Sequence, residues 1–155
     1  MKAVQFKKAH QMEVTSLDVP GLGDNDILLQ VEACGICGTD LHIVEGVARS
    51  TPPVVLGHEY AGRVVDVGKN VKGIRVGERV AVDPYIACGT CFYCARKAYA
   101  QCAFYKKNGT TAGFEPSGGG YAEYVLAFDW IVERGTLAIP DGVLAEEAAF
   151  VEPVN

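Results

Sequence analysis

Residues 57–82 read GHEYAGRVVDVGKNVKGIRVGERVAV. Within them, short runs rich in valine are interrupted by glycine at Gly62, Gly68, Gly73 and Gly77. β-branched residues favour strands, and glycine allows the chain to turn sharply between them. The pattern therefore predicts a mainly β fold, a small β-barrel with tight corners, and it argues against a helical bundle.

The same alternation of short apolar runs and turn residues continues on both sides of this stretch. Strands are expected over residues 2–6, 12–19, 26–33, 59–67, 78–82 and 121–128, and residues 54–57 form a brief apolar stretch that leads to His58. Helices are expected over residues 37–45, which end at Gly46, and 143–150, which follow Pro140. The pattern over residues 131–139 leaves the type of that element open. The chain contains no internal repeat, so residues 1–155 are expected to form one domain.

Composition and charge argue against several classes of protein. The chain has 155 residues and a formal net charge of −5 at pH 7. Non-specific nucleic-acid binding needs a basic surface, so we expect no nucleic-acid partner. The apolar runs are too short to cross a bilayer, and residues 1–4 do not begin the apolar core of a signal peptide. We therefore expect a cytoplasmic protein with no membrane partner.

Four cysteines with the spacing C-x2-C-x2-C-x7-C predict a closed metal site. They are Cys88, Cys91, Cys94 and Cys102. Two residues between thiolates allow a tight turn to direct both sulfurs to one ion, and zinc prefers four thiolates in a tetrahedron. Residues 87–107 contain few aliphatic side chains, so we expect a zinc lobe whose metal stabilises it in place of a core.

Two other interpretations of these cysteines compete with zinc. A disulfide framework requires an oxidising compartment, which the N-terminal sequence does not indicate. An iron–sulfur cluster also uses C-x2-C-x2-C, but in the ferredoxin-type run a proline follows the last cysteine. Here Ala103 follows Cys102. Structural zinc is favoured, and iron–sulfur remains the alternative.

Further candidate metal ligands lie in the stretches CGICGTDLH and GHEY. Cys37 and His58 offer a thiolate and an imidazole, a pair that can hold zinc. With a third protein ligand, one coordination position stays open for substrate, which is the catalytic arrangement. Glu59 and Glu152 are the candidates for that third ligand, and both remain open. By contrast, Cys34 is expected to be a buried apolar residue.

Six stretches resemble, in this order, the medium-chain, zinc-dependent alcohol and polyol dehydrogenases: CGICGTDLH, GHEYAGRVVDVG, GERVAV, CGTCFYC, GGYAEYV and FVEPVN. The resemblance extends from about residue 4 to residue 155 and concerns the N-terminal catalytic domain of the family, a GroES-like β-barrel. In the family a Rossmann domain follows. No G-x-G-x-x-G follows a strand in this sequence. We therefore expect that the nucleotide-binding domain is missing and that the chain is a fragment or one half of a split protein.

The resemblance implies a role for each candidate ligand. Cys37 and His58 match the first two ligands of the catalytic zinc. Glu152 matches the third-ligand position, where many alcohol dehydrogenases have cysteine and the polyol dehydrogenase branch has glutamate. Glu59 matches a glutamate beside the zinc that can approach or exchange as a ligand. The four cysteines of the lobe match the structural zinc ligands.

A proton relay is also implied by the resemblance. Thr39 matches the hydroxyl that exchanges a proton with the substrate oxygen, and His42 matches the far end of the relay. Asp40 matches a carboxylate that orients the zinc-bound histidine. Without the flanking match, Thr39 would be interpreted as the N-cap of its helix and His42 as an exposed helix residue.

The function that the resemblance implies is hydride transfer from a zinc-bound alkoxide to NAD or NADP, with a small alcohol or polyol as substrate. It implies two zinc ions per chain. The cofactor would bind only with the missing domain, so we expect no cofactor-binding residue here and an inactive isolated chain. Full-length relatives form dimers or tetramers, so a homo-oligomer is expected for the full-length protein. The alternatives are a non-catalytic GroES-like zinc-binding module and the zinc-free quinone reductase branch, which the complete set of ligand and relay residues disfavours.

Overall fold

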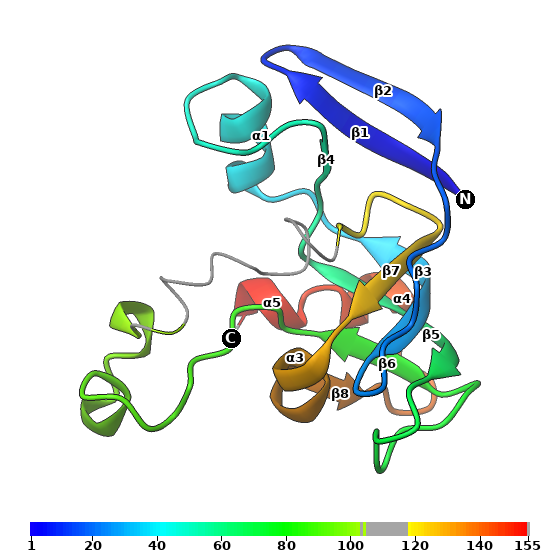
Figure 1. The fold of residues 1–155 in the computed structure, drawn as a ribbon, viewed down its shortest axis with the longest axis vertical. Coiled ribbons are helices and arrows are strands. Elements are labelled where there is room, and N and C mark those ends of the chain that lie inside the picture. Colours follow the sequence, from blue (N-terminus) through cyan, green and yellow to red (C-terminus); the bar gives the residue numbers. More distant parts are fainter. Residues whose placement is uncertain (103, 105–117, 155) are drawn as a thin grey trace.

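The computed structural model describes residues 1–102, 104 and 118–154, and strands dominate this part of the chain. The strands form two antiparallel sheets (Figure 1). The smaller sheet has the order β2-β1-β4, from β2 (Gln11–Ser16), β1 (Lys2–Lys8) and β4 (Val54–Val55). The larger sheet has the order β7-β3-β5-β6-β8, from β7 (Tyr124–Ala127), β3 (Ile27–Cys34), β5 (Tyr60–Val67), β6 (Arg79–Val82) and β8 (Thr136–Ala138).

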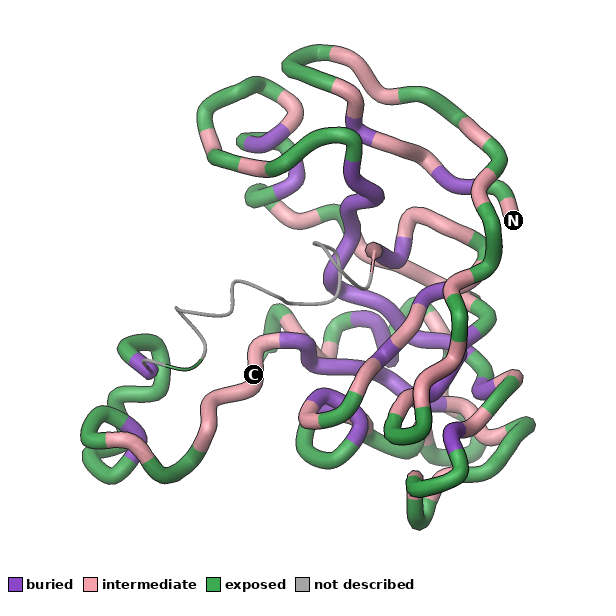
Figure 2. Tube along the Cα trace, viewed as in Figure 1, coloured by how far each residue is buried: buried purple, intermediate pink, exposed green. Residues whose placement is uncertain are grey.

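The main core lies on one face of the larger sheet. Residues from four strands and from helix α3 (Asp129–Gly135) pack together there, because alternate side chains of a strand point to the same face. Figure 2 shows the buried segments running through the centre of the molecule. The buried members of this core are Ile27, Leu29, Tyr60, Val64, Val80, Val82, Val125, Ala127, Ile131 and Val132.

The segment before β7 connects the two sheets. Ala3 and Ala122 form an isolated antiparallel bridge, and the N–H of Val4 donates to the carbonyl of Tyr121 at 2.8 Å. This segment also contacts the chain between β4 and β5, since the N–H of Tyr121 donates to the carbonyl of Leu56 at 3.0 Å. The closure between the sheets places Tyr121 beside the residues that precede β5.

The predicted first helix is present as α1 (Gly38–Val44), with Cys37 as its N-cap. The interpretation of Thr39 as the N-cap is therefore wrong, because Thr39 lies inside the first turn. Strand β2 ends at Ser16, earlier than predicted. Residues 131–139, whose type was open, contain the end of α3 followed by β8.

The single helix predicted over residues 143–150 is wrong in its extent. The structure has two short helices, α4 (Ala145–Ala148) and α5 (Val151–Val154), separated by a turn. Pro153 lies within the first turn of α5, where its missing N–H costs nothing, but its ring is incompatible with one continuous helix. Within the described residues, no helix is long and apolar enough to cross a membrane.

Candidate metal centres

The four cysteines of the predicted lobe converge on one point. One sulfur atom from each of Cys88, Cys91, Cys94 and Cys102 lies within 4.8 Å of the others. The sulfurs of Cys88 and Cys94 are 3.9 Å apart, and those of Cys91 and Cys94 are 3.5 Å apart. Four sulfurs at about 2.3 Å from one zinc ion would be separated by about 3.8 Å in a tetrahedron. The cysteines therefore fit a single zinc ion, and all are free of disulfide bonds.

Electrostatics within the lobe favour a bound cation. The N–H groups of Thr90 and Cys91 lower the pKa of the Cys88 thiol to about 6, which favours its thiolate form. Burial, followed by the neighbouring Cys91 thiol, raises the pKa of Cys94 to about 12. Four thiols at these distances cannot all ionise without a cation between them, so metal binding and deprotonation are coupled.

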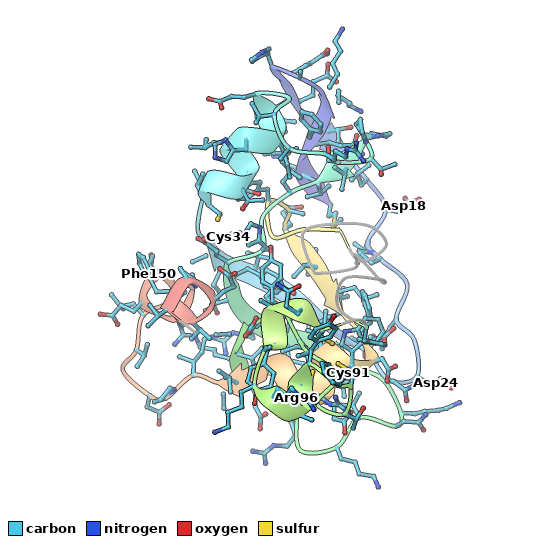
Figure 3. All side chains as sticks on the ribbon, turned by 90° about the vertical axis from the view of Figure 1, so that its left-hand side faces the viewer. Asp18, Asp24, Cys34, Cys91, Arg96 and Phe150 are labelled. Atoms are coloured by element: carbon cyan, nitrogen blue, oxygen red, sulfur yellow. The ribbon has the colours of Figure 1, made fainter. Side chains whose placement is uncertain are left out.

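The lobe lies apart from both sheets (Figure 1). Between residues 88 and 102, its regular structure consists of two single-turn helices, η1 (Cys94–Arg96) and η2 (Tyr99–Gln101). Figure 3 shows Cys91 and Arg96 on this lobe, and the Arg96 guanidinium lies 3.7 Å from the centre of the exposed Phe92 ring. One link to the main body is the guanidinium of Arg134, which donates to the carbonyl of Cys88 at 2.9 Å. Residues 103 and 105–107 of the predicted lobe lie outside the described residues.

A second group of metal-ligand side chains lies between α1 and β5. Ligand atoms of Cys37, His58 and Glu59 all lie within 4.8 Å of one another. Cys37 is half-buried, whereas His58 and Glu59 are buried. The edge of the Tyr85 ring packs against His58, with ring centroids 5.6 Å apart. A thiolate, an imidazole and a carboxylate together suit a divalent zinc ion.

Asp40 connects the two metal-ligand segments. Its carboxylate is buried, and Oδ2 accepts a hydrogen bond from the N–H of Cys37 at 3.0 Å. Its Oδ1 lies 3.6 Å from Nδ1 of His58. One carboxylate therefore caps α1 and faces the ring of His58, which lies just before β5.

Tyr121 is a site residue that the sequence did not reveal. Its hydroxyl lies 2.8 Å from Oδ2 of Asp40 and 3.1 Å from the carbonyl oxygen of Gly35. Burial and the neighbouring Asp40 raise the pKa of this phenol, which remains a hydrogen-bond donor. Tyr121 reaches the site only because long-range pairing brings the segment before β7 against α1. Periodicity in the sequence does not reveal such pairing, so it could not identify Tyr121.

The ring of Tyr121 also explains the glycine before His58. Gly57 has a φ of +94°, a left-handed conformation that side chains rarely adopt. A Cβ atom at this position would lie 2.8 Å from the Tyr121 ring and 2.9 Å from the sulfur of Cys34. The chain can therefore direct His58 into the site only with glycine before it.

Glu152 approaches the same site from α5. It is not among the residues whose ligand atoms lie within 4.8 Å of one another. Burial, then the charges of Glu59, Asp83 and Asp40, raise the pKa of the Glu152 carboxyl to about 7. Glu152 therefore experiences the negative charge of three other acidic groups, and such a concentration of negative charge favours a cation nearby.

The two relay candidates lie on α1. Thr39 is exposed, and its hydroxyl oxygen lies 3.6 Å from the sulfur of Cys37. His42 is exposed three residues further along the helix, with Nδ1 at 3.8 Å from Glu45. Residues three apart in a helix occupy neighbouring positions on its surface. Cys34 takes no part in either metal group and lies outside the lobe (Figure 3), and burial raises the pKa of its thiol to about 12.

Known proteins resemble this chain in sequence and in fold. The chain is 39% identical over 98% of its length to L-threonine 3-dehydrogenase of Pyrococcus abyssi (strain GE5 / Orsay), of which it covers 42%. It is 40% identical over 93% of its length to D-arabitol-phosphate dehydrogenase of Enterococcus avium, of which it covers 39%. The chain thus spans about two fifths of the length of these relatives.

A solved structure agrees over almost the whole chain. It is described as a zinc-binding dehydrogenase from Sinorhizobium meliloti 1021 bound to NADP, and the TM-score is 0.83 at 38% identity. The match covers 99% of this chain and 42% of that one. Residues 23–141 match the alcohol dehydrogenase GroES-like domain, which confirms the predicted mainly β, GroES-like fold. The chain therefore belongs to the zinc-dependent, medium-chain alcohol dehydrogenase family and carries its GroES-like domain.

Proposed function

We propose that residues 1–155 form the catalytic domain of a zinc-dependent, NAD(P)-linked dehydrogenase of small alcohols or polyols. The observation that carries the proposal is the coexistence of two metal-ligand groups of different chemistry in one domain. One group has four sulfurs, and the other combines sulfur, nitrogen and oxygen. A scaffold would need only the first group.

The lobe would hold a structural zinc ion. Cys88, Cys91, Cys94 and Cys102 would fill all four tetrahedral positions, so no position remains for a substrate. Such an ion would stabilise the lobe, because among residues 88–102 only Cys94 and Cys102 are buried. Zinc-finger peptides indicate an apparent contribution of about 10–16 kcal/mol for closed sites of this kind.

The second group would hold a catalytic zinc ion through Cys37, His58 and one glutamate. Glu59 already lies with the first two ligands, and Glu152 is the alternative from α5. Because Asp40 faces Nδ1 of His58, Nε2 is the ring nitrogen available to the ion. When bound, zinc supplies Lewis-acid chemistry that lowers the pKa of a coordinated hydroxyl group by several units.

The proton of the substrate hydroxyl would leave along α1. The Thr39 hydroxyl can accept one proton while it donates its own. His42, whose side chain is largely exposed, can then release a proton to solvent. Asp40 holds Cys37 and His58 in place during this transfer, because it is hydrogen-bonded to the first and faces the second.

The hydride acceptor would bind to a part of the protein that this chain does not include. The matched relatives are more than twice as long as the chain, and one of them was solved with NADP. A nicotinamide cofactor is usually held through its pyrophosphate at a glycine-rich helix N-terminus. We therefore expect the chain alone to bind metal and to oxidise no alcohol.

Metal analysis tests the proposal directly. We expect two zinc ions per chain after reconstitution, one of which is lost in Cys37→Ser and the other in Cys102→Ser. A single zinc that survives Cys37→Ser would favour a non-catalytic binding module, and iron would contradict both zinc sites. Activity is tested by NADH absorbance with a panel of alcohols and polyols, and a steady increase with the 155-residue chain alone would refute the dependence on further residues.

A further inference from the structure

A groove lies between the loop that joins α1 to β4 and the tip of the β1–β2 hairpin. We call it the α1–β4 groove, and its volume is about 670 Å³. The two walls lie side by side in Figure 1. Its floor is apolar, since the lining residues Phe6, Ile43 and Val54 are buried. Residues that line the groove walls are Lys8, Ala9, Arg49, Ser50 and Thr51.

The groove carries positive charge without a compensating acid. Lys8 and Arg49 line it from opposite walls, and no acidic residue is among the residues that line it. Among the described residues, neither cation has an ion pair, although Arg63, Arg75 and Arg79 elsewhere are each paired with a glutamate. Two unpaired cations across one groove attract an anion, in a chain whose net charge is −5.

The loop wall offers further donors. In the described part of the chain, the N–H groups of Arg49, Ser50 and Thr51 donate to no acceptor, and neither hydroxyl makes a hydrogen bond. Successive N–H groups without an acceptor inside the protein are available to donate to a bound anion. Three N–H groups, two hydroxyls and a guanidinium are more donors than a carboxylate can use, but they match the three terminal oxygens of a phosphate.

The groups that would repel an anion here are already engaged. The groove adjoins the C-terminal end of α1, where free carbonyl oxygens carry partial negative charge. The carbonyl of His42 accepts from Val47 at 2.8 Å, that of Ile43 accepts from Gly46 at 2.9 Å, and that of Val44 accepts from His10 at 2.7 Å. The nearby Glu45 carboxylate is directed to His42 at 3.8 Å.

We infer that the α1–β4 groove binds the phosphate of a small organic phosphate monoester. The guanidinium of Arg49 and the N–H and hydroxyl groups of residues 49–51 hold the phosphate. The ammonium of Lys8 neutralises further negative charge on the phosphate, and the floor around Phe6 contacts the organic part. The groove adjoins the end of α1 opposite to Cys37, and seven helical residues span about 10 Å. The inference therefore concerns a separate site and does not rest on the catalytic zinc.

The zinc-loaded chain can be titrated with phenyl phosphate, inorganic phosphate and benzoate while amide NMR signals are followed. We expect saturable shifts at residues 49–51, with phenyl phosphate binding more tightly than phosphate because of the apolar floor, and benzoate binding most weakly. Arg49→Gln should weaken phenyl phosphate binding about tenfold or more, and Lys8→Gln should weaken it less. Lys72→Gln removes an exposed charge from another loop that has no ion pair with any described residue, and it should have no effect.

Both groove variants replace exposed side chains, so the remaining spectrum should be unchanged and folding is verified in the same experiment. Shifts that centre on the residues lining the groove, residues 49–51 above all, and that disappear in Arg49→Gln support the site. The inference is wrong if phenyl phosphate shows no saturation, if its shifts centre on His58 or on the cysteine lobe, or if Lys72→Gln weakens binding as much as Arg49→Gln.

Discussion

Tyr121→Phe tests whether the second metal site depends on a residue that does not bind the metal. The substitution removes only the hydroxyl that lies 2.8 Å from Oδ2 of Asp40 and keeps the ring that packs beside Gly57. Of the two donors that Asp40 has among the described residues, it then loses the phenol and keeps the N–H of Cys37. The carboxylate would be held less firmly opposite Nδ1 of His58.

The size of the effect follows from two independent estimates. A hydrogen bond to a charged group contributes about 1.5–3 kcal/mol. At about 1.4 kcal/mol for each factor of ten, this corresponds to an affinity change of about 10- to 100-fold. Substitutions of residues that orient metal ligands typically weaken metal binding by about the same factor. We therefore expect Tyr121→Phe to weaken metal binding at Cys37 and His58 by about 10- to 100-fold.

Cobalt(II) offers a suitable measurement, because its visible spectrum distinguishes a site with four sulfurs from one with a single sulfur. A competing chelator then gives the affinity of each site in the same sample. The four-cysteine lobe serves as an internal control, since Tyr121 makes no contact with its ligands among the described hydrogen bonds. Tyr124→Phe is the matched control, because the hydroxyl of Tyr124 has no hydrogen-bond partner in the described part of the chain.

Two results would refute the reasoning about Tyr121. Equal affinity of the second site in Tyr121→Phe and in the parent protein would show that Asp40 holds its position without the phenol. Equal weakening of both cobalt sites would show a general loss of stability, with no positioning role for Tyr121.

Three further changes have defined outcomes. Tyr60→Phe removes a buried hydroxyl that has no hydrogen-bond partner among the described residues, so thermal denaturation should show about 1 kcal/mol of added stability, and a loss would indicate a bound water. Gly57→Ala forces a side chain into a left-handed conformation against the Tyr121 ring, so urea denaturation should show a loss of at least about 1–3 kcal/mol. Cys102→Ser should expose residues 88–102 to proteolysis while the sheets stay protected, because the lobe has little core of its own. Uniform cleavage throughout the chain would contradict the idea that the lobe unfolds separately from the sheets.

The sequence predicted those features that depend on local spacing. The four cysteines lie within fifteen residues of one another, so their separations alone limit how far apart their sulfurs can be. The strand at residues 60–67 follows from alternating β-branched residues between two glycines. The helix that starts after Cys37 follows from the turn residues before it and the apolar residues within it.

Features that depend on distant pairing were not predictable in this way. Tyr121 and Asp40 are 81 residues apart, and only the closure between the two sheets brings them together. The turn between α4 and α5 did not follow from the sequence pattern, because alanine and glutamate favour a continuous helix. The roles of Cys37 and His58 came from resemblance to a family, since a lone cysteine and a lone histidine are weak signals.

Asp40 shows why a local and a functional interpretation of one residue need not compete. At the third position of α1 it accepts the N–H of Cys37, as a residue that starts a helix would do. The same carboxylate faces His58 from the other metal-ligand segment. The helix start thus places one buried charge next to both ligand segments, since the carboxylate accepts the N–H of Cys37 and lies 3.6 Å from Nδ1 of His58. That charge, with Glu59, Asp83 and Glu152 nearby, is costly unless a cation neutralises it, so the stability of this region and its capacity for metal have the same origin.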